Sequence, residues 1–443
     1  MKLKKLISTL ACIATPMGSL VANDNVPAPE QSHPILLRGA TLHTVSGDVI
    51  PDGQLLFAQG KIQNVGGPDL KLDLADGTEV IELKGKHIYP GLIAANTVLG
   101  LTEVRAVRAM RDMIEPGKIN PNARAQVAVN PDSELLPVTR SNGVLVVQVV
   151  PQSSGSGSIS GTSAVMALDG WTWEDMTVSP DCGLHITWPR MIVSEGDGSE
   201  AAKKRASESR KSRDERIAGL EKAFDDARAY LKARSANPDA TATDLRWEAM
   251  RPLMDGDVAA FIHANSSAQI RAALAFAKKQ GIEKLVIVGA QDAWRLATQM
   301  KAQSAAAIIS PINDSPMRRW EATNTPQLNP QRLLEAGVRF CIANDGNSFG
   351  AAHERNLPYQ AGRSALSRDE AIKSITLYPA QILGIADRLG SLDVGKDATL
   401  IVTDGDPLEI PTQVEHAFIG GRKIDLSNKQ TRLFEKYQEK YKG

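Results

Sequence analysis

The fold of this chain is decided by the stretch LYPAQILGIADRLGSLDVGKDATLIVTDGDPLE, which spans residues 377–409. Its second half contains DATLIVTDGDP, short apolar runs punctuated by Gly and Asp that are typical of antiparallel strands. The same texture occurs near the N-terminus in ILLRGATLHTV, GQLLFAQGKIQNVG and TEVIELKGKHIYPG. The two ends of the chain therefore predict short antiparallel strands that flank a region of different pattern.

The region between these ends alternates apolar runs with helical patterns. The near-continuous apolar character of the runs predicts strands of a parallel sheet that is covered on both faces. The candidate strands are 143–151, 183–189, 258–264, 283–290, 306–310 and 337–345. The helices between them have clear ends: NPQRLLEAG begins at Asn329, has Pro330 in its first turn and stops at Gly337. Repeated βα units over about 300 residues are typical of a (β/α)8 barrel.

The N-terminus predicts a targeting segment. MKLKK supplies positive charge, LISTLACIA is an apolar stretch too short to anchor in a bilayer, and GSLVA ends in small residues. We expect cleavage after Ala22 and export to the periplasm or the exterior. TLAC offers a weaker lipoprotein alternative at Cys12, because Thr9 stands where Leu is usual. The mature chain would keep Cys182 and Cys341, too few for a disulfide framework, and Cys341 in VRFCIA is expected to be a buried free thiol.

Composition narrows the class of protein. Apolar content of 42% and charged content of 23% are ordinary for a soluble globular chain. Zero formal net charge and 5% aromatic residues argue against nucleic acid as a partner. No segment predicts a membrane span. Charge gathers in residues 195–250, where a helical stripe predicts a solvated helix laid across the barrel. The stripe consists of Ile217, Leu220, Phe224, Ala227 and Leu231. The basic run KKRASESRKSR before it leaves an anion or partner surface as the alternative.

Two segments carry a resemblance to a known family. IYPGLIAANTVLGL (88–101) resembles the first barrel strand of the amidohydrolase superfamily, and residues 377–409 resemble its C-terminal signature, where the last barrel helix passes into a small β-domain. NLPYQAG (356–362) and IRAALAFAKKQGIEKLVIVGAQDAWRLA further resemble the branch related to imidazolonepropionase. The resemblance covers nearly all of the mature chain. It implies an α/β fold, a TIM-type (β/α)8 barrel with a small β-sandwich domain formed by the N- and C-terminal segments.

The resemblance also implies an organisation along the chain. We expect a signal peptide at 1–22, a linker at 23–33, a composite β-domain from 34–87 plus 388–426, the barrel at 88–387 and a C-terminal helical tail at 427–443.

The chemistry that the resemblance implies depends on metal ligands at the ends of barrel strands. A divalent ion lowers the pKa of bound water to about 7 and polarises a carbonyl group. The family set is a His-x-His pair on strand 1, Lys or Glu on strand 4, one His each on strands 5 and 6, and an Asp on strand 8 that takes a proton from water. The strand 1 pair falls on Asn96 and Val98, and the strand 6 histidine on Gly289. His263 and Asp345 match strands 5 and 8.

Three of the histidines in that set are therefore lost. A catalytic zinc ion typically has three protein ligands and one open position, and His263 plus Asp345 supply two. A third ligand would have to come from Asn96, Glu103, His185 or His353. Structural alternatives stay open: a core histidine at His263, a loop cap at Asp345, an Asn that holds a turn at Asn96, and a surface imidazole at His353.

Two further segments bear on the catalytic face. PQSSGSGSISGTS (151–163) follows a predicted strand, so we expect a mobile substrate loop or lid there, whose backbone N–H groups could face an anion. The sequence gives no Gly-x-Ser-x-Gly elbow and no supporting His–Asp spacing for a serine nucleophile. In GWTWEDM, Trp171 and Trp173 form either an apolar wall of the site or a packed hairpin.

Two functions remain open at this point. The first is a divergent hydrolase that acts on a C–N bond, amide or cyclic amide, of a small molecule. It would use His263 and Asp345 as catalytic residues, and either one divalent metal such as zinc, held by His263, Asp345, Asn96 and His185, or no metal. The second is a catalytically inactive binding or partner subunit in the periplasm that keeps the barrel as a scaffold. Both imply a small-molecule substrate or ligand, and the resemblance implies a homo-oligomer such as a dimer.

Overall fold

The computed structural model describes residues 25–344, 346 and 350–442. The predicted signal peptide at 1–22 and the candidate aspartate Asp345 lie outside these residues. No helix in the described ranges is both long enough and apolar enough to cross a membrane.

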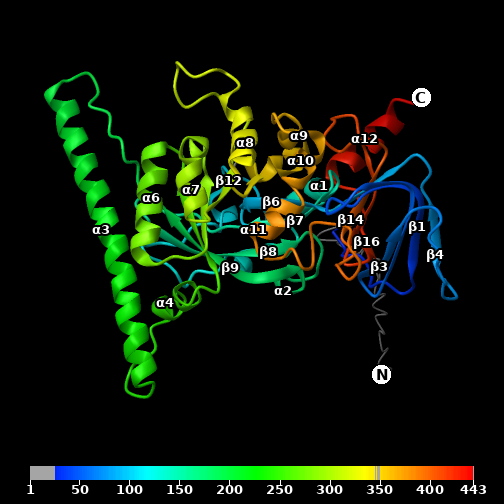
Figure 1. Cartoon of the computed structure of the whole chain (residues 1–443), viewed down its shortest axis with the longest axis horizontal. Helices are drawn as coiled ribbons and strands as arrows, with labels where there is room; N and C mark the ends of the chain where they lie inside the picture. Colours follow the sequence, from blue (N-terminus) through cyan, green and yellow to red (C-terminus); the bar gives the residue numbers. More distant parts are fainter. Residues whose placement is uncertain (1–24, 345, 347–349, 443) are drawn as a thin grey trace, which may run out of the picture.

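The central element is an eight-stranded sheet whose neighbours follow one another in chain order (Figure 1). Its strands are β6 (Leu92–Thr97), β7 (Val144–Val149), β8 (Ile159–Ala167), β9 (Thr177–Thr187), β10 (Ala259–Ala264), β11 (Leu285–Gly289), β12 (Ala306–Ile309) and β13 (Phe340–Ile342). Residues 374–375 bridge its two edges, because Ile93 N donates to Ile375 O over 2.8 Å and Ile342 N donates to Ser374 O over 3.1 Å. The sheet is a nearly closed barrel.

The prediction of a barrel built wholly of parallel βα units is wrong at the third strand. β8 is antiparallel to both β7 and β9, whereas the other neighbouring pairs are parallel. The connection from β7 to β8, residues 150–158, contains no helix, and the connection from β8 to β9 contains only α2 (Trp173–Met176). A parallel crossover needs about a dozen or more residues, so these short connections force hairpin-like reversals.

This reversal corrects two predictions about the catalytic face. The loop expected at 151–163 is shorter, since Ile159 already begins β8 and only 150–158 remain outside the strands. Residues 168–176 follow the reversed strand and therefore lie at the opposite end of the barrel from the C-terminal ends of β9 and β10. Trp171 is 68% exposed there and Trp173 packs against the core from α2, so neither forms a wall of the site.

Helices surround the barrel and connect its strands (Figure 1). They are η1 (Arg108–Met110), η2 (Ala125–Ala128), α1 (Leu135–Arg140), α6 (Ser267–Gln280), η3 (Ala293–Leu296), α7 (Ala297–Ala302), α8 (Thr325–Ala336), η4 (Gly350–Asn356), α9 (Leu357–Gly362), α10 (Arg368–Lys373) and α11 (Leu377–Ile382). α6 illustrates how sequence sets an end: Ser266 and Gln269 form a capping box at its start, and Gly281 with φ 70° stops it.

The charged region forms α3 (Glu200–Ala236), which the chain leaves through α4 (Leu245–Glu248) and α5 (Arg251–Met254). Its second half buries an apolar stripe, and Phe224 meets Phe276 of α6 edge to face at 5.1 Å. Its first half is mostly exposed. Figure 1 shows α3 along the side of the barrel that is remote from the second sheet. The prediction of a solvated helix laid across the barrel is confirmed.

A second sheet joins the two ends of the chain. It contains β1 (Ile35–His43), β2 (Val49–Ala58), β3 (Lys61–Gly66), β4 (Glu79–Glu82), β5 (His87–Pro90), β14 (Leu400–Thr403), β15 (Val414–Ile419) and β16 (Arg422–Lys423). β14 pairs antiparallel with β5, and Phe57 meets Phe418 in a core of its own. A sheet domain from both chain ends is therefore confirmed, although its strands form one continuous sheet instead of two separate ones.

The terminal segments pack on this framework. Residues 25–33, expected as a linker, contain no helix or strand, but Ala28 N donates to the Asp169 carboxylate and Gln31 bonds to Phe57 O and Gly60 N. At the other end α12 (Lys429–Lys440) forms the expected helical tail.

Candidate active site

His263 stands at the C-terminal end of β10, where its partly buried ring contacts a second imidazole. Its Nε2 lies 3.0 Å from Nδ1 of His185 on β9. The strand register explains the arrangement: His263 pairs with Thr187, so His185 sits one inward-facing step deeper in the barrel. His185 is wholly buried and stacks on Phe261 with centroids 4.8 Å apart. His263 Nδ1 forms no hydrogen bond to any residue that the structure describes.

The His pair ends a chain of buried side chains that crosses five strands. His185 Nε2 lies 2.8 Å from Ser163 Oγ on β8, and Gln148 Nε2 on β7 donates to that hydroxyl over 3.0 Å. Gln148 Oε1 in turn accepts the backbone N–H of Asn96 on β6 over 3.1 Å. Sequence reasoning missed Gln148 and Ser163. The available signal was a lone polar residue inside the apolar run VLVVQVV, since a polar group in a buried strand needs a partner.

Two proton arrangements satisfy this chain. In one, Ser163 donates to His185 and His185 Nδ1 donates to His263, which leaves a proton on His263 Nδ1. In the other, His263 Nε2 donates inward, His185 donates to Ser163, and the serine hydroxyl turns to the Cys182 sulfur 3.1 Å away. His263 Nδ1 is a donor in the first arrangement and an acceptor in the second. Both arrangements keep the rings neutral.

Burial keeps both imidazoles uncharged at neutral pH. It lowers the pKa of His263 to about 4, because the surroundings do not solvate an imidazolium. Burial, together with the neighbouring His263, also holds the pKa of His185 well below its ordinary value. A neutral ring is the form that can accept a proton.

These lowered pKa values predict a stability that depends on pH. Between about pH 4 and pH 6.5 His263 is protonated in the unfolded chain but not in the folded chain. The free energy of unfolding is therefore highest above the unfolded pKa and falls as pH falls. We expect His263 alone to account for roughly 2–3 kcal/mol of this loss. Urea unfolding of wild type and His263→Gln at several pH values measures it. The variant should lose less stability than wild type as pH falls, and an unchanged slope would contradict the burial of this imidazole.

Asn96 occupies the first position of the expected strand 1 pair and adopts a left-handed backbone with φ 56°, which Asn tolerates. Its side chain is 5% exposed, and its Oδ1 has no hydrogen-bond partner among the described residues. It packs against Gly346, where a Cβ would clash with Asn96 Nδ2 and O. Asn96 thus lies beside the backbone that follows Asp345. Val98, the second position of the pair, is wholly buried in the core.

Gly289, the position of the strand 6 histidine, is occupied by a neighbour's side chain. Its φ is 88°, and a Cβ built there would clash with the Asn265 carboxamide. Asn265 follows His263 by two residues and is exposed. A side chain at 289 therefore requires a strained backbone and a displaced Asn265. Both the missing side chain and the local backbone at Gly289 are therefore unsuited to the histidine ligand that the family carries at this position.

The remaining candidates have ordinary structural partners. Glu103 accepts hydrogen bonds from Ser133 Oγ over 2.5 Å and from Glu134 N over 3.1 Å, which orders the chain before α1. His353 is exposed in η4. Cys182 and Cys341 are both free thiols, and Cys341 is buried as expected.

The described residues do not fit the family's metal cluster. No group of three His, Cys, Asp or Glu side chains within the described ranges is placed to hold an ion. Val98 and Gly289 carry no donor, and His263 Nε2 is engaged with His185.

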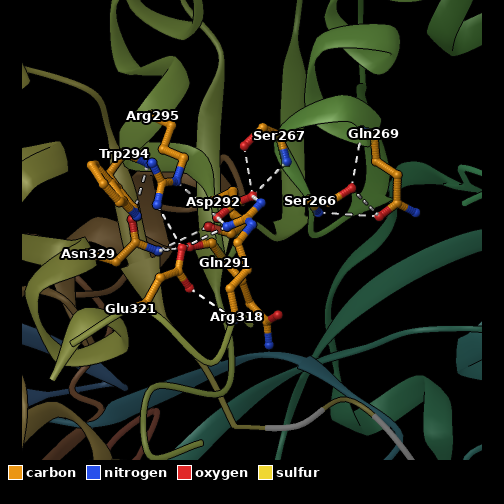
Figure 2. A network of polar contacts seen from close by, with 11 residues as sticks. Ser266, Ser267, Gln269, Gln291, Asp292, Trp294, Arg295, Arg318, Glu321 and Asn329 are labelled. Atoms are coloured by element: carbon orange, nitrogen blue, oxygen red, sulfur yellow. Dashed lines mark hydrogen bonds and ion pairs between the residues drawn. The ribbon is translucent and has the colours of Figure 1, made fainter. Parts of the chain in front are cut away.

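A separate ion-pair network fixes the rim of the barrel after β11 (Figure 2). Asp292 accepts hydrogen bonds from Ser267 N over 2.8 Å and from Arg318 Nη2 over 2.6 Å. Burial alone would raise the pKa of Asp292, but these hydrogen bonds lower it to about 2. Glu321 pairs with Arg318 and Arg295 over 2.7 Å and 2.6 Å. Ser267 follows β10, Asp292 follows β11 and Arg318 follows β12, so the network holds these three connections together.

The Phe261 ring, which stacks on His185, allows the packing of the site to be tested. Gly183 precedes His185 on β9, and a Cβ there would clash with the Phe261 ring and Ala259 O. We expect Gly183→Ala to cost about 1–3 kcal/mol through overpacking. Gly219→Ala in exposed α3, where nothing lies near the new methyl, should stabilise by up to about 1 kcal/mol. Denaturant unfolding measures the free energy of unfolding of both variants. Equal changes in Gly183→Ala and Gly219→Ala would contradict the packing described for β9 and β10.

Comparison with known proteins settles the family. The model of the amidohydrolase family matches residues 176–424, more than half of the chain. The chain belongs to the amidohydrolase family. An amidohydrolase structure from Thermotoga maritima MSB8 shares the fold with a TM-score of 0.76 at 23% identity, over 88% of this chain and 99% of that one.

Among amidohydrolase relatives, the chain is related to the imidazolonepropionase branch. It is 30% identical to imidazolonepropionase of Syntrophobacter fumaroxidans over 115 residues, 24% of this chain and 26% of that protein. It is 23% identical to adenine deaminase 3 of Rhizobium meliloti over 407 residues, 88% of this chain and 57% of that protein. The chain thus spans only about a quarter of the first relative and less than two thirds of the second.

Proposed function

We propose that this chain is an exported hydrolase that cleaves a C–N bond, amide or cyclic amide, of a small molecule with a reduced site. His263 and Asp345 are its catalytic residues. The observation that carries the proposal is the imidazole of His263 at a strand's C-terminal end, where barrel active sites lie. One of its nitrogens is oriented by His185 and the other has no partner among the described residues. Relatives named as a deaminase and as an N-substituted formamide deformylase support the bond class.

The chemistry proposed for these residues is general acid–base catalysis. His263 is neutral at neutral pH, so its Nδ1 can accept a proton in one arrangement of the chain and donate one in the other. Asp345, placed by the resemblance at the end of strand 8, takes the proton from the attacking water. The water oxygen bonds to the carbonyl carbon, the C–N bond breaks, and the proton taken from the water is passed to the leaving nitrogen. Positioning and proton transfer are what these residues supply.

The test is a substrate panel combined with elemental analysis. Chain purified without chelator is incubated with N-substituted formamides, five- and six-membered cyclic amides and dipeptides, and released amine is measured by mass spectrometry. The same reactions are repeated after dialysis against chelator. We expect turnover of at least one amide class and no more than about one divalent ion per chain. Two ions per chain would overturn the reduced site, and folded chain without turnover on any class would overturn the hydrolase.

The second function is a binding subunit without catalysis. It is favoured by the closure of two ligand positions, because Val98 is buried in the core and Asn265 covers Gly289. Here the barrel would act as a scaffold for a small ligand. Native mass spectrometry should then find a co-purified ligand whose retention is unchanged in Asp345→Asn. Loss of turnover in that variant would instead support the hydrolase.

A further inference from the structure

A groove that is not part of the site described above lies between the loop after β9 and the first half of α3 and has a volume of about 750 Å³. Its loop wall is Pro189, Arg190 and the run 192–194, which contains Ile and Val. Its helix wall presents side chains at 205, 209, 212 and 216, which share one face of α3 because they recur three or four residues apart. The face extends about 17 Å along the helix.

Arg216 closes the inner end of this groove, and its guanidinium forms no ion pair with any residue that the structure describes. Its side chain is half-buried, and Nη2 donates to Gly157 O over 2.7 Å and to Thr187 O over 3.4 Å. Its Nε is buried without a partner in the described part of the chain. Burial lowers the pKa of Arg216, and no carboxylate contributes to the shift. A partly desolvated cation with only carbonyl partners is costly by itself and is stabilised by an anion.

The rest of the groove is cationic as well. Arg190 and Arg205 are exposed and form no ion pair with any described residue. Arg213 pairs with Asp214 at 2.8 Å, and among the described residues Glu208 is the one acidic side chain that lines the groove. Three other basic residues of the run 203–213 form ion pairs, namely Lys203, Arg210 and Lys211, whereas Lys204 forms none with any described residue and does not line the groove. The guanidinium groups of Arg190, Arg205 and Arg216 therefore leave uncompensated positive charge along the groove.

We propose that this groove binds an extended acidic segment of a polypeptide. Guanidinium groups pair with carboxylates in a planar, two-point geometry, and here they are spread along the groove instead of converging on one point. The apolar wall of Ile192 and Val193 fits the side chains between successive carboxylates. A compact anion would reach only one end of this array. The proposed peptide site is independent of the proposed hydrolysis. The two sites are nevertheless close, because Thr187, whose carbonyl accepts from Arg216, pairs with His263 in the sheet.

The test uses the full chain and two labelled peptides of equal length, one with alternating Glu and Leu and one with Gln in place of Glu. Fluorescence anisotropy at low salt should show binding of the Glu peptide and at least about tenfold weaker binding of the Gln peptide. Arg216→Gln should weaken binding of the Glu peptide by about 10- to 100-fold, since it removes hydrogen bonds to a charged group. Arg205→Gln should weaken it by about threefold.

Lys211→Gln is the matched control, because Lys211 is a basic residue of the same helix that does not line the groove. It should bind the Glu peptide as wild type does. Arg205→Gln also guards against misfolding, since Arg205 is exposed. Equal affinity for the two peptides, or unchanged affinity in both arginine variants, would overturn the proposal. Displacement of the peptide by glutarate at equal concentration would also overturn it, because the site would then recognise a compact dicarboxylate.

Discussion

Replacing His263 with Gln lowers kcat/KM on the amide found in the panel by about a hundredfold to ten-thousandfold, the range expected for loss of a general acid–base. Gln can still bond to His185 through its amide, but it cannot take up or release a proton at neutral pH. The folded structure should persist, because the ring is only partly buried. Steady-state kinetics on the purified variant, with circular dichroism as the check on folding, measure the effect.

His185 provides the contrast within the same pair. It is wholly buried behind His263, so we assign it as a positioning residue. His185→Gln should lower kcat more than it raises KM and should shift the acid limb of the pH–rate profile, which a merely structural role would not do. His353→Gln should leave kcat/KM unchanged. Unaltered kinetics in His263→Gln would remove His263 from the mechanism.

Replacing Asp169 with Ala destabilises the fold by about 3–5 kcal/mol, because it leaves a buried arginine without its counterion. Arg140 Nη1 lies 3.3 Å from the Asp169 carboxylate, with both side chains at most 4% exposed. Arg422 Nη1 reaches the other carboxylate oxygen over 3.1 Å, and Ala28 N also donates to it. Burial raises the pKa of Asp169 despite the two guanidinium groups. This carboxylate ties the N-terminal segment, α1 and β16 together.

Urea unfolding near neutral pH measures the loss, and a double-mutant cycle separates its cause. Asp169→Leu combined with Arg140→Met should cost less than the sum of the two single variants, since the double variant no longer contains the buried Arg140 charge that Asp169→Leu alone leaves without its counterion. Glu200→Ala is the matched surface control, because its pair with Lys203 is highly exposed and should be worth less than about 1 kcal/mol. Similar losses for Asp169→Ala and Glu200→Ala would contradict the buried tie.

Much of the fold was readable from local pattern. The apolar runs at 258–264 and 283–290 predicted β10 and β11 within a few residues, and Gly337 correctly marked the end of α8. The third barrel strand was missed because ISGTSAVMA follows a Ser- and Gly-rich stretch that is typical of a loop. Its direction depends on the short connections to β7 and β9, which only become informative once the neighbouring strands are placed.

The sequence by itself determined that this chain is an amidohydrolase relative whose strand 1 and strand 6 positions no longer carry imidazoles, because residue type is a local property. Only the tertiary structure decided what replaced them. His185 and His263 meet through the register of β9 and β10, Ser163 and Gln148 join them from β8 and β7, and Asn265 covers Gly289. These contacts join residues that are distant in the chain, and burial, a property of the packed barrel, keeps both imidazoles neutral.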